Sequence, residues 1–140
     1  MTITATSDGV PQWQAVAVGD TCLFHVRDGV LARAFPLEHS TQFHNAPKLV
    51  GARMSLPQVA EGRSAWEDGL GRAGDRLWAM TDALAQWCLA ECESGRDPWG
   101  ELELLLAGPA DGCLFEDWID RLRQSRRLRN DDVTLVAVLL

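Results

Sequence analysis

The chain has 140 residues, a net charge of −7 and a hydrophobic share of 46%. This length fits one domain, and the apolar share indicates a globular chain rather than a disordered one. The acidic balance argues against nucleic acid as a partner, no apolar run is long enough to cross a membrane, and the N-terminus lacks the pattern of a signal peptide, so we expect a cytoplasmic protein.

The first part of the chain predicts three strands after a loose segment at residues 1–12. The strands are expected at residues 13–18, 22–27 and 30–35. Gly19-Asp20 and Asp28-Gly29 are turn signals between them, and an Asp-Gly pair is typical of a two-residue hairpin. Together the three strands predict an antiparallel meander.

The middle of the chain predicts long connections. Residues 36–60 have no clean period and contain at most one short strand, near residues 51–55. Residues 61–74 are rich in glycine and charge, and Trp66 is expected to anchor this second connection on the core. His39 and His44 are interpreted as ordinary loop polarity, because nothing pairs them with a nucleophile.

The last part of the chain predicts a strand, three helices and a final buried strand. Their expected ranges are residues 76–80, 83–93, 99–107, 114–122 and 133–140. The whole order predicts one α+β domain, with helices packed on one face of an antiparallel β-sheet.

Two acidic segments stand at strand ends. Asp82 follows the strand at residues 76–80, and Asp131 and Asp132 come just before the final strand. Carboxylate oxygens are the ligands that magnesium and manganese prefer, so this pattern predicts a site for a hard cation. The alternative is structural, because Asp82 could cap the next helix and carboxylates are common at turns.

Three motifs, in order, resemble the metal-dependent serine/threonine phosphatases of the protein phosphatase 2C type, above all their bacterial members. Gly19-Asp20-Thr21 resembles the "GDS" hairpin of that family. The stretch from Gly74-Asp75 to Thr81-Asp82 resembles its "GD…L.L.(S/T)DG" segment, and Asp131-Asp132-Val133-Thr134 resembles its closing "DN(I/V)T" strand. The resemblance covers residues 13–140.

The resemblance implies half of a two-sheet sandwich that hydrolyses phosphoesters with a metal-activated water. It implies that Asp82 and Asp131 are ligands of one or two Mn²⁺ or Mg²⁺ ions, while Asp132 stands at the usual asparagine and shares this assignment with Asp131. Asp20 and Gly19 correspond to a structural turn. The implied substrates are phosphorylated proteins or small phosphoesters.

The sequence also departs from the family pattern. The family's phosphate-binding arginine and metal-bridging acidic segment have no counterpart in residues 1–14, and Ala83 stands at the usual glycine. A half sandwich would expose an apolar sheet face, so we expect a symmetric homodimer. Two interpretations stay open: a hydrolase with weakly held metal, and a non-catalytic or split phosphatase-like module that acts in binding or assembly.

Overall fold

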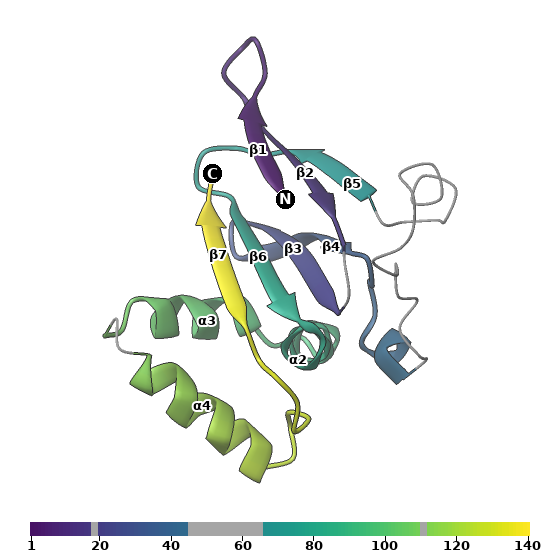
Figure 1. The fold of residues 1–140 in the computed structure, drawn as a ribbon. Helices are drawn as coiled ribbons and strands as arrows, with labels where there is room; N and C mark the ends of the chain where they lie inside the picture. The colour runs from purple at the N-terminus through teal and green to yellow at the C-terminus, as the bar shows by residue number, and fades with distance from the viewer. Residues whose placement is uncertain (18–19, 45–65, 110–111) are drawn as a thin grey trace.

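A computed structural model describes residues 1–17, 20–44, 66–109 and 112–140. Within these residues the chain forms two antiparallel sheets and three α-helices (Figure 1). The four-stranded sheet has the order β4 (Val30–Phe35), β3 (Thr21–Arg27), β6 (Arg76–Thr81) and β7 (Leu135–Leu139). The three-stranded sheet has the order β1 (Thr2–Ala5), β2 (Pro11–Val16) and β5 (Trp66–Leu70). The helical elements are η1 (Ser40–His44), α2 (Asp82–Glu93), α3 (Pro98–Leu106) and α4 (Cys113–Gln124).

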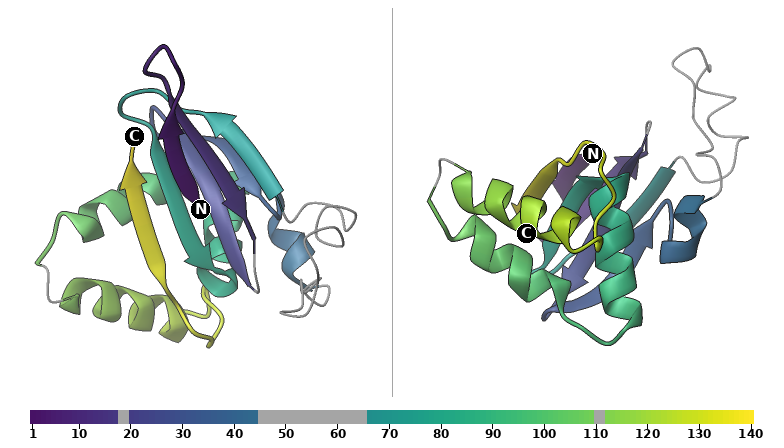
Figure 2. Two further views of the ribbon diagram at one scale, coloured as in Figure 1. Left: turned by 45° about the horizontal axis from the view of Figure 1, so that its top comes forward. Right: turned by 90° about the horizontal axis from the view of Figure 1, so that it is seen from below.

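The elements form three layers, with the four-stranded sheet in the middle. The helices cover one of its faces, and the three-stranded sheet lies against the other (Figure 2). The predicted α+β fold, with helices on one face of an antiparallel sheet, is therefore confirmed. The middle sheet is buried on both faces, which explains why β3 and β6 read as nearly continuous apolar runs.

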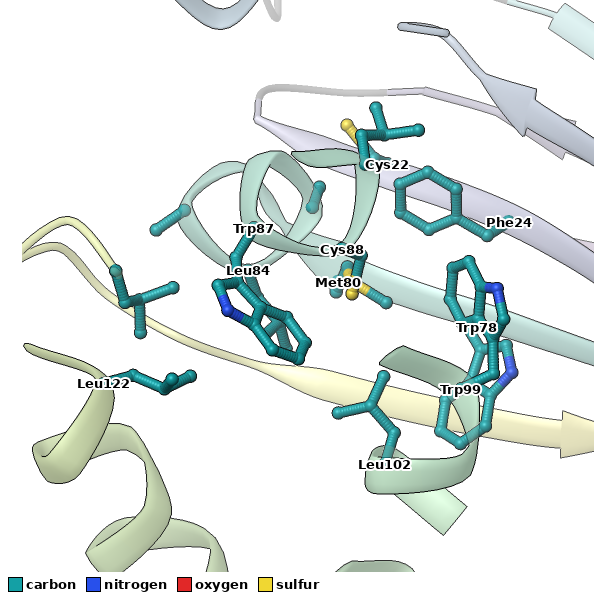
Figure 3. Close-up of a cluster of buried hydrophobic side chains, with 14 of the residues drawn as sticks. Cys22, Phe24, Trp78, Met80, Leu84, Trp87, Cys88, Trp99, Leu102 and Leu122 are labelled. Carbon is teal, nitrogen blue, oxygen red and sulfur yellow. The ribbon is translucent and has the colours of Figure 1, made fainter. Parts of the chain in front are cut away.

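Alternation along the two central strands sorts their side chains between two cores. On β6, Trp78 and Met80 face the helices, while Leu77 and Ala79 face the three-stranded sheet. Each side chain therefore takes the face that the period of two assigns to it. Figure 3 shows the core on the helix side, where Trp78 and Trp99 lie side by side and Trp87 extends toward Leu122.

The start of α3 and the buried face of α4 follow signals in the sequence. Asp97 caps α3, because its carboxylate accepts the backbone N–H groups of Trp99 and Gly100 at 3.0 and 3.1 Å. On α4 the apolar stripe of the sequence is the buried face, with Trp118, Ile119 and Leu122 turned inward. The predictions of the three α-helices are thus confirmed to within two residues at every end.

The predicted meander is wrong at its first strand. The hairpin of β3 and β4 forms, but β2 pairs with β1 and β5 in the other sheet. The segment expected to be loose thus contains β1, and the connection expected at residues 61–74 contains β5. The reason is packing: Trp13 is buried against Leu23 and Leu77, and a Cβ on Gly69 would lie 2.6 Å from its ring. Only glycine lets β5 run so close to that indole.

The final strand also differs from its prediction as a buried strand. β7 pairs with β6 and is an edge strand in the described part of the chain, with Val136 and Leu139 exposed to 50% and 60%. The strand expected at residues 51–55, the anchoring role of the Trp66 side chain and the position of Gly19 lie outside the described residues.

Candidate functional site

The structure brings the two acidic segments to the same end of the middle sheet. We call this place the β6–β7 junction; it comprises Thr81, Asp82, Asp131, Asp132 and Thr134. The Thr81 hydroxyl donates to the carbonyl oxygen of Asp132 at 2.9 Å and accepts the Thr134 N–H at 3.0 Å. The antiparallel register of β6 and β7, in which Met80 lies opposite Leu135, explains this convergence.

Asp82 is the first residue of α2, and its carboxylate forms an ion pair. Arg129 Nη2, from the segment between α4 and β7, lies 2.5 Å from Asp82 Oδ2. Both side chains are partly exposed, at 28% for Asp82 and 40% for Arg129. Thr81 holds the N-cap position without a side-chain capping bond, so Asp82 stabilises the helix through its charge in the first turn rather than as a cap.

Asp131 and Asp132 are exposed and are held mainly through their backbone. The Asp131 carbonyl accepts a hydrogen bond from Arg123 Nη2 at 2.5 Å, and its carboxylate accepts the Asp132 N–H at 2.9 Å. The Asp132 carbonyl accepts the Thr81 hydroxyl, as described above. The structure therefore fixes where the two loops meet, while both carboxylates stay at the surface.

Asp20 lies in a turn directly before β3, and its negative charge acts on the thiol of Cys22 on that strand. The Cys22 thiol is buried. Burial, and after it the negative charges of Asp82 and Asp20, raise the pKa of Cys22 to about 12. At neutral pH the thiol keeps its proton, so Cys22 is a packing residue rather than a nucleophile.

Sequence reasoning missed a second polar centre, at the other end of β6. We call it the Asp75 network. The buried carboxylate of Asp75 lies 2.7 Å from both Arg27 Nη2 and His25 Nε2, and it accepts the backbone N–H of Arg72 at 2.9 Å. The hydrogen bonds from Arg27, and then those from His25 and Arg72, hold the pKa of Asp75 well below its usual range.

The Asp75 network is structural by its geometry. It ties the turn before β6 to β3, and the buried carboxylate has donors on both of its oxygens. One signal in the sequence could have revealed it. The period of two turns His25 into the sheet interior, where a histidine needs a polar partner, and Asp75 stands in the glycine-rich turn that reaches this place.

The residues of the junction have the right donor chemistry for a magnesium or manganese ion. Asp82 and Asp131 offer hard carboxylate oxygens. The guanidinium of Arg129 forms an ion pair with Asp82, so this carboxylate already has one cationic partner. In the described part of the chain, no three His, Cys, Asp or Glu side chains gather closely enough to hold a metal. The described residues thus fit part of a site, in which a bound ion would take most of its ligands from water.

Comparisons with models of protein families, with curated proteins and with solved structures find no match to the chain. Among the described residues, none of the helices has the length and apolar character needed to cross a membrane. The resemblance to the phosphatases therefore stays a prediction that depends on three sequence motifs.

Proposed function

We propose that the chain is a metal-dependent phosphoester hydrolase that resembles the phosphatases of the protein phosphatase 2C type. The observation that supports this proposal is the β6–β7 junction, where the Thr81 hydroxyl bonds two backbone groups of the closing motif, the Asp132 carbonyl and the Thr134 N–H. Two acidic segments that lie 49 positions apart, from Asp82 to Asp131, thereby meet at one exposed end of a sheet. The substrates that we propose are phosphorylated proteins or small phosphoesters.

In this proposal Asp82 and Asp131 hold Mn²⁺ or Mg²⁺, and Asp132 assists. A bound ion supplies an activated water and charge compensation for the phosphoryl oxygens. Thr81 keeps the two carboxylate-bearing segments together through its two hydrogen bonds. Arg123 positions the second segment, because its guanidinium donates to the Asp131 carbonyl.

The test is hydrolysis of an aryl phosphate by the purified chain, with Mn²⁺ and with a chelator. We expect manganese-dependent turnover that falls at least about tenfold in Asp131→Asn, because a ligand and a charge are lost together. Asp117→Asn is the matched control, since it removes the same charge from an exposed position on α4. Folded protein that shows no turnover with Mn²⁺, or equal turnover in both variants, would contradict the proposal.

A non-catalytic module that acts in binding or assembly is the second candidate, and the Asp82–Arg129 ion pair favours it. In this case Arg129 is the permanent counter-charge of Asp82, and no metal is needed. The exposed Val136 and Leu139 on the edge strand β7 would contribute to the proposed homodimer. Sedimentation that reveals a dimer unaffected by chelator, together with absent hydrolysis, would support this candidate.

A further inference from the structure

A shallow cleft of about 400 Å³ lies between α4 and the segment that leads into β7. Figure 1 shows these two elements on the same side of the molecule. Three apolar side chains line the cleft: Phe115 and Ile119 of α4, and Val133 at the start of the final segment. A volume of this size is at the lower end of the range for ligand pockets, and it accommodates one or two side chains rather than a whole folded surface.

The rim of this cleft carries an excess of negative charge. Glu116, Asp120 and Asp132 are exposed carboxylates that line it, and Arg123 is the cation among the lining residues. The guanidinium of Arg123 donates to the backbone carbonyl of Asp131, so it is directed at the loop. A group of opposite charge is thus favoured in the cleft.

Helix geometry strengthens the case for a cationic occupant. Glu116 and Asp120 are four residues apart on α4, so their like charges face each other on the same side of the helix and repel. In the described structure no ion pair involves either of them. A positive side chain placed between them would remove this repulsion, and an apolar neighbour of that side chain would cover Phe115 and Val133.

We propose that this cleft binds a peptide segment in which arginine or lysine lies next to an apolar side chain. Charge complementarity selects the cationic group, and the apolar lining selects its neighbour. The inference stands apart from the proposed hydrolase activity, because peptide binding here needs no metal and shares only Asp132 with the β6–β7 junction.

The experiment measures calorimetric binding of two blocked peptides, Gly-Arg-Leu-Arg-Gly and the same peptide with glutamates in place of the arginines. We expect binding of the basic peptide in the range of about 0.1–1 mM, and none of the acidic peptide. The double variant Glu116→Gln/Asp120→Asn should weaken binding roughly tenfold, because the ion pairs of both carboxylates with the peptide are lost.

The matched control is Asp8→Asn/Asp117→Asn, which removes the same charge at exposed positions that do not line the cleft. We expect this variant to bind the basic peptide as the original chain does. Equal weakening in both double variants would mean general attraction to an acidic protein, and it would overturn the proposal. So would absent binding at millimolar peptide, or equal binding of a peptide with glycine in place of the leucine.

Discussion

An aspartate stands at each end of strand β6 and pairs with an arginine, but one of the two carboxylates is buried and the other is partly exposed. At its start, the buried Asp75 is bound by Arg27, by His25 and by a backbone N–H. At its end, the partly exposed Asp82 has one ion-pair partner, Arg129. A buried carboxylate must be fully paired, and it then stabilises the fold, whereas a partly exposed carboxylate with one partner can exchange that partner at low cost. The first end therefore stabilises the fold, and the second end is the one at which we propose that a metal ion binds.

Glu91 belongs with Asp75 in this comparison. It is buried on α2, and its carboxylate pairs with Arg96 and with Arg127, whose Nη2 lies 2.8 Å from Oε2. The hydrogen bonds from Arg96, followed by those from Arg127, lower its pKa. Glu91 thus fixes the end of α2 to the segment after α4, while Asp75 fixes β6 to β3.

Removing the charge at the buried end of β6 should have the largest effect. We expect Asp75→Asn to lower the free energy of unfolding by about 3–5 kcal/mol, because Arg27 and His25 lose their common partner inside the protein. Asp82→Asn, the matched change at the other end, should cost less than about 1 kcal/mol. Urea unfolding of the three proteins measures both effects, and losses of equal size would refute the distinction between the two ends.

Acid should weaken the fold through the same buried carboxylates. The folded-state pKa values of Asp75 and Glu91 lie below their ordinary values of 3.8 and 4.5, so the unfolded chain binds more protons in this range. Their stabilisation is complete above about pH 5 and is lost as the pH falls through these values toward the folded-state pKa.

We therefore expect the free energy of unfolding to fall between pH 5 and pH 3, by an amount smaller than the full loss caused by Asp75→Asn. Unfolding series at several pH values measure this slope. Asp75→Asn should flatten it, since one of the carboxylates with a lowered pKa is gone. An unchanged slope in Asp75→Asn would show that Asp75 does not contribute to the pH dependence of the free energy of unfolding.

The layers of this fold were predictable in part. Alternation and helical periodicity identify β3, β6 and the three helices, because these signals are local in the sequence. They do not say which sheet a strand joins. β2 leaves its expected partner because Trp13 packs between the sheets, against Leu23 and Leu77, and a contact of that kind has no signature in local spacing.

The candidate site, too, could be predicted from local signals only in part. That Asp82 and Asp131 stand at strand ends could be derived from the sequence, and the junction at Thr81 follows once β6 and β7 pair. The ion pair of Asp82 with Arg129 could not, because no local spacing links a carboxylate at a strand end to an arginine 47 positions further along the chain. Only the path of the chain after α4 directs this arginine to Asp82.

The smallest effect that we predict concerns this ion pair. A double-mutant cycle with Arg129→Gln and Asp82→Asn should give a coupling energy of about 0.2–1 kcal/mol, because both side chains are partly exposed. The coupling should shrink in 1 M salt, where exposed charges are screened. Arg126→Gln is the control, since Arg126 is a nearby arginine without an ion pair among the described residues. A coupling energy of zero at low salt would contradict this prediction: the ion pair would add no stability, and the contrast with the closed network around Asp75 would be sharper still.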